Sequence, residues 1–411
     1  MTAQDPPPES LIRHRPFLLY WGARTVSAMA FQMIGVAVGW QMYALTGSAL
    51  DLGLVGLAQF VPAVSFVLIA GNIADRYDRR VVLQLCRSVL VLAAAALALG
   101  SLEGWVGKAF LLTTVFCIGA ARAFEGPTNQ TLLPALVSTT LYPRAVAASS
   151  SAQQVATIVG PAIGGFLYGV SPVFVYTVCS ILSFLAVVFL FFVGYRPNKT
   201  ARPPLSLATF FAGLAYIGEN KIVFGAILLD LFTVLLGGAT ALLPIYAKDV
   251  LDVGPSGLGM LRAAPAAGSL LVLMVLTRWP LQSKVGRIMF TMVAIYGFAT
   301  VVFAVSPWFW LSFAALVFLG AGDGVSVVIR ITLVQLETPD AMRGRVSSVN
   351  SLFANAANQL GDFRAGAMAA AIGAIPAALV GGIGTLIVVA LGIKLFPDLY
   401  RVDSFRGIRQ T

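Results

Sequence analysis

Histidine, cysteine and charged side chains are all scarce in this chain of 411 residues. It contains one histidine and three cysteines, and only 11% of its residues are charged. Because soluble domains carry roughly a quarter charged residues, this composition excludes an ordinary soluble protein. The histidine, His14, precedes the first long apolar run. Proton transfer inside the apolar runs would therefore depend on carboxylates.

The cysteines Cys86, Cys117 and Cys179 fall inside apolar runs, at no spacing typical of a metal site or a disulfide framework. We predict that they are small buried hydrophobic residues, and we predict no metal and no cofactor. The sequence also lacks a His-Glu-x-x-His motif and a phosphate-binding Walker loop. These absences argue against an intramembrane enzyme and an ATP-driven pump, and the short loops leave no room for a sensor domain.

Apolar residues make up 58% of the chain, and its mean hydropathy is +0.88. Runs long enough to cross a bilayer as helices recur along the whole sequence. The predicted fold class is therefore an all-α membrane protein with twelve transmembrane helices. The predicted spans are 16–45, 51–72, 80–101, 108–136, 145–169, 172–195, 222–248, 255–279, 286–306, 308–335, 346–371 and 375–396.

The net charge of +10 invites a nucleic-acid partner, but the distribution of charge argues against one. Lysine and arginine lie in short loops that alternate along the chain, as the positive-inside rule requires. We therefore expect both termini on the cytoplasmic side, membrane lipids as partners, and no nucleic acid. The start of the chain lacks the basic region of a cleavable signal, so we expect the first run to remain as a span.

The two sets of six runs are copies of each other. A shift of 201 residues pairs Gly160 with Gly361 and Arg144 with Arg345, and a Pro-rich polar linker separates the sets. The predicted domains are a disordered cytoplasmic N-terminus at 1–15, a six-helix bundle at 16–195, a cytoplasmic linker with an interfacial helix at 196–221, a second bundle at 222–396, and a cytoplasmic tail at 397–411.

A charged stretch, residues 71–80, separates the second and third spans, and we expect a loop there. Its pattern Gly-x-x-x-Asp-Arg-x-x-Arg-Arg resembles the loop signature of the major facilitator superfamily, with Asp78 where that pattern most often has glycine. The resemblance implies two pseudo-symmetric six-helix bundles that rock around a cargo bound between them near the midplane. It also implies a conformational gating motif made of Gly71, Asp75, Arg76, Arg79 and Arg80.

The fifth span contains Gly160, Pro161, Gly164 and Gly165. Small residues let two helices approach closely, and a proline inside a helix removes one backbone hydrogen bond. The group is similar to the antiporter signature of drug/proton exporters in this superfamily, although Ala156 stands where the fuller pattern has glycine. The resemblance implies export, and generic helix packing is the alternative explanation.

Charged side chains also lie inside the predicted spans, where a charge is costly unless it is paired or solvated. Arg122 and Glu125 are three residues apart in a stretch that resembles another superfamily motif, so we expect them to share a helix face and pair. This pair could load and release a proton, or it could be static. The 201-residue shift places Arg122 opposite Asp323, which predicts a gate or coupling pair between the halves.

Further pairs are expected by depth and spacing. Arg24 and Asp230 lie at similar depths in the first and seventh spans and could pair. Arg87 and Arg262 lie closer to helix ends and are expected to extend their guanidinium groups to the membrane surface. The complete set of proton-coupling or charge-pair candidates is Arg24, Arg122, Glu125, Asp230, Asp323, Arg330, Asp362 and Arg364.

The last third of the chain, from Asp323 to Gly366, resembles the enterobactin-exporter-like branch, the transmembrane secretion effector family. The resemblance implies a monomer in the bacterial inner membrane that exports siderophore-like or drug-like molecules by alternating access and proton antiport. Uptake or facilitated transport of a small solute or lipid without proton coupling is the alternative. Substrate-cavity candidates are Gln32, Gln41, Phe124, Asn129, Asn355 and Gln359.

Overall fold

A computed structural model describes residues 11–194 and 207–405. Within those ranges the chain is almost entirely helical and contains no strand. The predicted linker and the first ten residues lie outside the described ranges. Residues Leu11–Arg13, which were expected to be disordered, form a short 3-10 helix.

The first six predicted spans correspond to helices within a few residues of the expected bounds. The second span is divided into two helices. The bounds are α1 (Arg15–Thr46), α2 (Ala49–Ser65), α3 (Val67–Arg76), α4 (Arg79–Glu103), α5 (Lys108–Leu136), α6 (Tyr142–Val170) and α7 (Pro172–Phe191).

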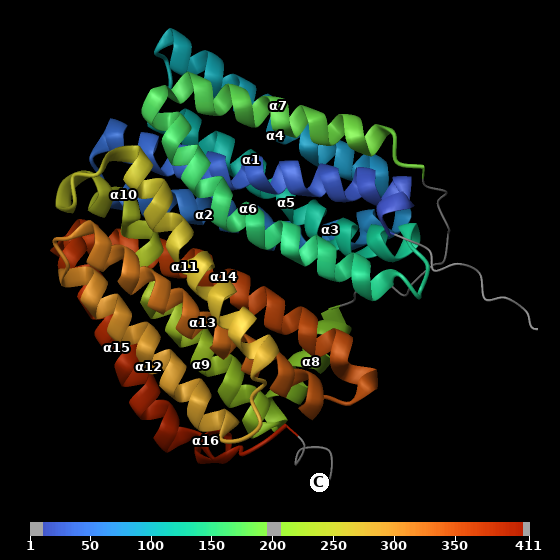
Figure 1. The fold of residues 1–411 in the computed structure, drawn as a ribbon, viewed down its shortest axis with the longest axis vertical. Helices are drawn as coiled ribbons and strands as arrows, with labels where there is room; N and C mark the ends of the chain where they lie inside the picture. Colours follow the sequence, from blue (N-terminus) through green and yellow to red (C-terminus); the bar gives the residue numbers. More distant parts are fainter. Residues whose placement is uncertain (1–10, 195–206, 406–411) are drawn as a thin grey trace, which may run out of the picture. The chain divides into compact units, whose positions relative to one another are not determined.

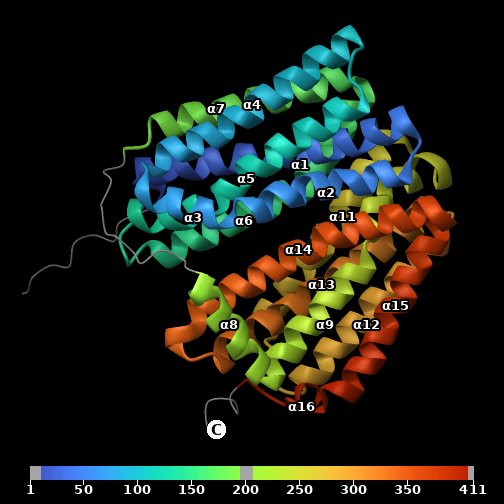
Figure 2. The same cartoon turned by 180° about the vertical axis from the view of Figure 1, so that it is seen from behind.

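A helix, α8 (Leu207–Glu219), is present where the interfacial helix was predicted, and it lies against α14 (Figure 2). Its position at the membrane surface stays a prediction. The seventh span is irregular after α9, because the chain passes through η2 (Ala239–Leu242), α10 (Leu243–Ile245) and η3 (Tyr246–Val250). The other bounds are α9 (Lys221–Gly237), α11 (Gly254–Arg278), α12 (Val285–Val305), α13 (Phe309–Glu337), α14 (Asp340–Ile372), α15 (Ala374–Leu395) and α16 (Pro397–Arg401).

The chain divides into two compact units, of which the first comprises 1–38 and 61–204 and the second 39–60 and 205–411. The end of α1 and most of α2 therefore pack with the second unit. The hydroxyl of Tyr43 donates to Asp249, and a Cβ added at Gly366 would lie 2.6 Å from the backbone nitrogen of Gly53. The bundle boundaries read from the sequence stay a prediction.

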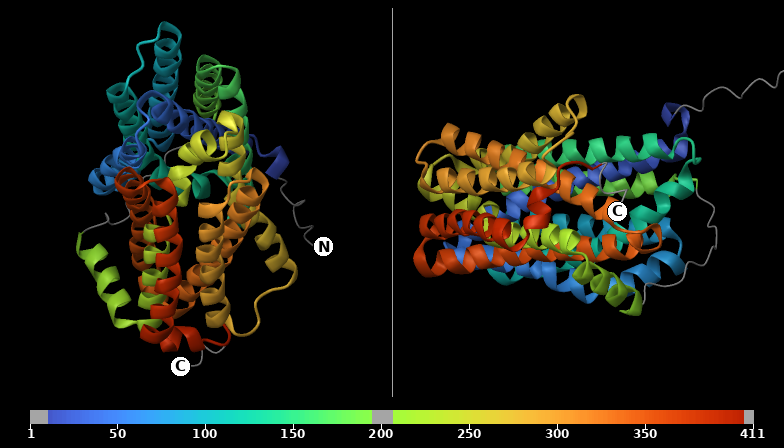
Figure 3. Two further views of the ribbon diagram at one scale, coloured as in Figure 1. Left: turned by 90° about the vertical axis from the view of Figure 1, so that its left-hand side faces the viewer. Right: turned by 90° about the horizontal axis from the view of Figure 1, so that it is seen from below.

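Each unit has an apolar core built from several helices. In the first unit, Tyr20, Leu83, Leu132 and Leu190 join α1, α4, α5 and α7, and α4 lies beside α7 (Figure 1). In the second unit the corresponding cluster joins α9, α12, α13 and α15, which run side by side (Figure 3). These cores fix which helix faces meet inside each unit.

Nine of the described helical segments are long and apolar enough to cross a membrane by themselves. The three remaining predicted spans correspond to α2, α6 and α14. Of these, α2 is 17 residues long, while α6 and α14 are repeat-equivalent helices rich in polar residues. A helix that is polar on one face is stable in a membrane only where neighbouring helices or an aqueous cavity cover that face.

The stretch at 71–80 is not the loop that the sequence suggested. Helix α3 continues to Arg76, and only Tyr77 and Asp78 lie outside helices. Asp78 is the N-cap of α4, and its carboxylate accepts from the backbone N–H of Arg80 at 2.9 Å. A capping aspartate accepts a hydrogen bond from a backbone N–H that has no partner inside the helix. Helix α4 can therefore begin directly after Asp78, and the connection from α3 is only two residues long.

The C-terminal tail is partly structured, which the sequence did not indicate. Helix α16 places Leu399 in the core of the second unit, where its side chain is completely buried. The backbone N–H groups of Val285 and Gly286 donate to the carbonyls of Asp403 and Val402. The tail therefore caps the start of α12.

Candidate transport site

The centre of the first unit contains a buried ion pair between neighbouring helices. Arg87 in α4 lies 2.7 Å from a carboxylate oxygen of Glu125 in α5, and the Arg87 side chain is only 3% exposed. The prediction that Arg87 reaches the membrane surface is therefore wrong. Its position inside an apolar run, together with an acidic residue in the next span, was the signal in the sequence. The pair satisfies one internal charge on each helix.

Arg122 interacts electrostatically with Glu125, as expected, and also has a neighbour that the sequence did not suggest. Its guanidinium lies over the ring of Phe31, 3.7 Å from the ring centroid, while Glu125 forms its ion pair with Arg87. This is a cation–π contact between α5 and α1. Although Arg122 is the fifteenth residue of the 29-residue helix α5, its side chain is exposed.

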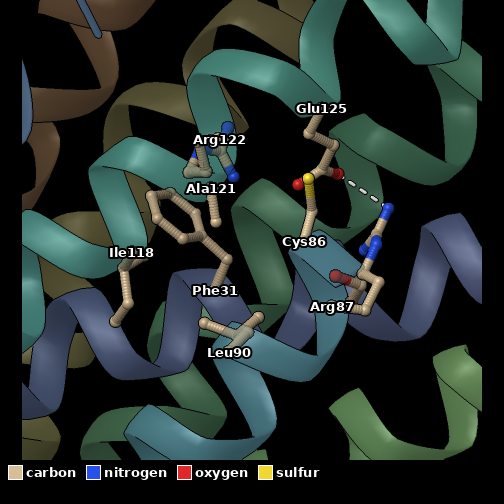
Figure 4. A pocket seen from close by; sticks show the side chains of 9 residues that line it. Phe31, Cys86, Arg87, Leu90, Ile118, Ala121, Arg122 and Glu125 are labelled. Atoms are coloured by element: carbon tan, nitrogen blue, oxygen red, sulfur yellow. Dashed lines mark ion pairs between the residues drawn. The ribbon is translucent and has the colours of Figure 1, made fainter. Parts of the chain in front are cut away.

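These groups surround a small pocket within the first unit. Figure 4 shows Arg122 and Phe31 on one side and the Arg87–Glu125 pair, drawn with a dashed line, on the other. The cavity volume is about 10 Å³, close to the space that one water molecule needs. The remaining lining residues are Ser27, Cys86, Leu90, Ile118 and Ala121.

The side-chain amide of Asn129 extends this network. It lies 3.4 Å from Glu125, and its oxygen accepts from the hydroxyl of Tyr20 at 3.2 Å. Arg24 also interacts electrostatically with Tyr20 and Glu125. Arg24 therefore joins the cluster of the first unit, whereas the sequence had suggested a pair with an aspartate of the seventh span.

The other predicted cavity residues occupy varied positions. The ring of Phe124 packs against the ring of Phe66, with 5.7 Å between the ring centroids. The side chain of Gln41 is buried. The Asn355 amide donates to a carbonyl of its own helix, and the backbone oxygen of Gln359 faces Gly56 of α2. Of the six candidates, only Asn129 touches the charged cluster of the first unit among the described contacts.

The second unit has its own buried ion pair. Arg330 in α13 lies 3.2 Å from Asp230 in α9, and it also donates to Asn350 at 2.7 Å. Asp230 is thus paired within its own unit. Asp323, seven residues before Arg330, interacts electrostatically with both members of this pair. In the part of the chain that the structure describes, Asp323 forms no ion pair.

Asp362 and Arg364 contact different helices, as their spacing of two residues predicts. Asp362 lies against Gly56 of α2 and interacts electrostatically with Arg262, so Arg262 also belongs to the interior of the unit. The guanidinium of Arg364 donates to the carbonyl of Leu236 at the end of α9. A cation at a helix C-terminus is favourable because unpaired carbonyls concentrate negative charge there.

Glycines bring α6 and α1 into close contact. A Cβ added at Gly160 would lie 2.8 Å from Cβ of Gln32, and one at Gly164 would lie 2.7 Å from Cα of Met33. Gly160, Pro161, Gly164 and Gly165 are all buried. The packing interpretation of this motif therefore has direct support, and the role in export stays a prediction.

The gating motif ties the start of α4 to two other helices. Arg79 donates to the carbonyl of Thr131 at 3.1 Å, and Arg80 donates to the carbonyl of Val193 at 2.9 Å. Burial raises the pKa of the Asp78 carboxyl, but the hydrogen bonds and charge of Arg80 outweigh burial and leave this pKa below its ordinary value. Arg76 is exposed, and the Asp75 side chain lies outside what the structure describes.

No cluster of metal-ligating side chains occurs among the described residues. The cysteine prediction is right for two positions and wrong for one. Cys86 and Cys179 are buried, while Cys117 is exposed on the surface of α5. A cysteine in a membrane-spanning helix can face lipid as easily as the protein interior. Its place in an apolar run therefore does not show whether it is buried.

Solved transporters of the major facilitator superfamily share this architecture. A bacterial homologue of the human lysosomal transporter Spinster, in an inward-facing and unoccupied conformation, has a TM-score of 0.74 at 15% identity, over 97% of this chain and 99% of that one. The nucleoside transporter NupG has a TM-score of 0.68 at 15% identity, over 96% and 99%. The chain is therefore a multi-pass membrane protein with the major facilitator fold.

The family follows from sequence comparison. A model of the transmembrane secretion effector family matches residues 8–405, and the chain belongs to that family. It is 26% identical to the enterobactin exporter EntS of Escherichia coli O139:H28 (strain E24377A / ETEC), over 97% of this chain and 95% of the relative. The protein of the same name from Shigella boydii serotype 18 (strain CDC 3083-94 / BS512) matches to the same extent. The chain is thus a secondary transporter of small molecules and not an enzyme.

Proposed function

We propose that the protein exports small organic molecules, siderophore-like or drug-like, across the bacterial inner membrane in exchange for protons. The two bundles alternate access to a cargo site between them, and both termini are cytoplasmic. The similarity to enterobactin exporters supports export, and the motif around Gly160 and Pro161 is similar to that of antiporters. We further propose that the protein works as a monomer in contact with membrane lipids.

The observation that carries proton coupling is the position of Asp323. Its carboxyl lies in the middle of α13 and forms no ion pair among the described residues, whereas Glu125 and Asp230 are each held by an arginine. A carboxyl without a fixed counter-charge can bind a proton without breaking an ion pair. Asp323 is therefore the preferred carrier, and Asp362 is the second.

We also propose that Arg122 and Asp323 form a gate between the halves. The internal repeat makes the two positions equivalent, and their charges are opposite. Cysteines placed at both positions should crosslink in one transport state and separate in the other. Failure of every short crosslinker, in every state trapped by cargo or pH, would contradict the gate.

The test of the proposed function uses inverted membrane vesicles with an imposed pH gradient. Cargo accumulation should depend on the gradient in the natural protein. Asp323→Asn should abolish accumulation while preserving exchange of labelled for unlabelled cargo, because exchange needs no net proton movement. Asp398→Asn, which changes an exposed aspartate of α16, is the matched control and should behave as the natural protein does.

Uptake or facilitated transport of a small solute or lipid is the alternative function. It would appear in the same vesicles as cargo movement that is equal with and without the gradient. That result would remove proton coupling from the proposal.

A further inference from the structure

The exposed position of Arg122 is unusual for a charge in the middle of a spanning helix. Fourteen residues of α5 precede it and fourteen follow, so no end of the helix is within reach of its guanidinium. A charge at this depth is tolerated where it faces water or a polar partner. Arg122 is therefore suited to face an aqueous space from which a ligand can approach.

The two units differ in the balance of their interior charges. Charged residues at least seven positions from both ends of their helix are counted as interior. In the first unit they are three arginines and one carboxylate, and in the second they are three arginines and three aspartates. The first set is Arg24, Arg87, Arg122 and Glu125, and the second is Asp230, Arg262, Asp323, Arg330, Asp362 and Arg364.

Within the first unit, the one interior carboxylate forms its ion pair with Arg87 and attracts Arg122 only electrostatically. Glu125 lies 2.7 Å from Arg87, and Asn129 adds a further contact to it. Arg122 instead stacks its flat face on Phe31. A guanidinium that stacks through its flat face can still donate hydrogen bonds from the N–H groups at its edge. Two of these N–H groups match the two oxygens of a carboxylate.

We propose that Arg122, stacked on Phe31, binds the anionic group of an organic-anion cargo. This inference rests on the proposed function, because it names the class of cargo that the transporter carries. The cavity beside Arg122 has room for about one water-sized group, so an oxygen of the anion enters while the body of the cargo stays outside. Leu90 and Ile118 line the same cavity and lower the local dielectric, which strengthens the attraction.

A cationic or neutral cargo fits this site less well. Arg24 and Arg87 outnumber Glu125 in this cluster, and the remaining positive charge repels a cation and attracts an anion. A neutral amide can accept a hydrogen bond from Arg122, but only a carboxylate offers two acceptor oxygens to the guanidinium and a full opposite charge. The site should therefore distinguish a carboxylate from the amide of the same shape.

The test compares such matched pairs on the full chain in lipid nanodiscs. The probes are salicylate and salicylamide, 1-naphthoate and 1-naphthamide, and dansylglycine and dansylglycinamide. A ligand that binds the folded protein raises the temperature of the unfolding midpoint, by an amount that grows with the ratio of ligand concentration to Kd. At least one carboxylate should stabilise the natural protein at about a tenfold lower concentration than its amide. Equal effects, no effect from any probe, or a preference for the amides would overturn the proposal.

Variants then assign the preference to Arg122. Arg122→Gln should remove the preference for the carboxylate, whereas Arg278→Gln, which changes an exposed arginine at the end of α11, should keep it. If Arg122→Gln does not fold, Arg122→Lys and Phe31→Leu replace it, and each should reduce the preference severalfold. A preference that survives these changes would overturn the proposal.

The outcome separates this inference from the proposed function. Binding in nanodiscs needs no pH gradient and has no direction. If transport in vesicles does not depend on the pH gradient, the proposal of proton coupling is wrong and the proposal of anion binding still stands. Loss of the anion preference would leave gradient-driven export standing and remove only the class of cargo.

Discussion

The two units build the same helix contact from different side chains. In the first unit, Gly160 of α6 packs against α1 at Gln32, and in the second, Gly361 of α14 packs against α9 at Leu235. The shift of 201 residues relates the glycines, and a shift of 203 relates their partners. The contact requires only a missing Cβ on one helix, so the facing residue can be polar or apolar.

A second contact is also repeated. Arg80, at the start of α4, binds the carbonyl of Val193, after the sixth span. In the second unit, Gly286 at the start of α12 lies against the backbone of Leu399 and Tyr400, after the twelfth span. The start of α4 therefore contacts the segment after α7, and the start of α12 contacts the segment after α15. Only the chemistry differs, because one unit uses a guanidinium and the other a backbone approach.

Interior charges are where the units differ most. Arg122 and Asp323 occupy equivalent positions with opposite charge, and the ion pairs of the two units join different helices. The repeat thus keeps the contacts that set the backbone, while the polar groups that serve transport are free to diverge. Four experiments test whether the backbone contacts are equivalent in the two units and the charged groups are not.

The largest expected effect comes from breaking the ion pair of the first unit. Glu125→Gln leaves Arg87 buried without its counter-charge, which should lower the free energy of unfolding by about 3–5 kcal/mol. Asp230→Asn should cost less, about 1–3 kcal/mol, because Asn350 still accepts from Arg330. Denaturant titration of the purified protein measures both. Equal losses would show that the two pairs are equally supported.

The exposed pair between Arg343 and Asp340 provides the control for that comparison. Arg343→Gln should change the free energy of unfolding by less than about 1 kcal/mol, since solvent already screens the pair.

The shared glycine contact should be equally sensitive in both units. Gly160→Ala places a Cβ 2.8 Å from Cβ of Gln32, and Gly361→Ala places one 2.8 Å from the carbonyl oxygen of Val234. Each should lower the free energy of unfolding by about 1–3 kcal/mol through overpacking. Gly344→Ala has open space around its Cβ and should be neutral or stabilising by about 0.5–1 kcal/mol. A tolerated change at only one contact would break the equivalence of the units.

Of the equivalent helices α4 and α12, only α4 begins with a side-chain cap. The N-cap of α4 is Asp78, whereas Lys284 at the start of α12 makes no side-chain cap. Asp78→Ala should therefore cost about 1 kcal/mol in the free energy of unfolding. Because the folded pKa of this carboxyl is lowered, its ionised form stabilises the fold above the unfolded pKa of about 3.9, and this stability is lost as pH falls through the folded pKa.

Asp78→Asn distinguishes the cap from the charge. It should keep most of the capping stability and lose the pH dependence below pH of about 4, because an amide caps without titrating. Unfolding measured between neutral and acidic pH would contradict the assignment if the natural protein and Asp78→Asn lost stability in parallel.

The smallest effect should come from the docked tail of the second unit. The guanidinium of Arg287 lies 5.7 Å from the ring centroid of Tyr400. Arg287→Gln should cost about 0.5–1 kcal/mol locally and speed hydrogen exchange in residues 397–405. Arg401→Gln, on the exposed side of the tail, is the control. Unchanged exchange in both variants would mean that backbone contacts alone hold the tail.

Several features of the site could be read from the sequence and several could not. Helices at the predicted spans, a helix at the position of the predicted interfacial one, and the set of interior charges all appear in the structure. The ion-pair partners differed from the prediction for two carboxylates, since Glu125 pairs with Arg87, although it also attracts Arg122, and Asp230 pairs with Arg330. Spacing along one helix suggested Arg122 as the partner of Glu125, and matching depth suggested Arg24 as the partner of Asp230. Each carboxylate instead forms its ion pair with an arginine of a neighbouring helix in its own unit.

The sequence by itself determined the helical membrane class, the internal repeat, and the small set of charges that must be shielded. The class and the charges follow from local composition, because a bilayer tests every stretch of about 20 residues separately. The repeat follows from residues that recur in register between the two halves. The tertiary structure decided which charges meet and which side chain faces a cavity. Those outcomes depend on the rotation of each helix about its axis, and that rotation is set by close contacts such as Gly160 on Gln32, between residues far apart in the chain.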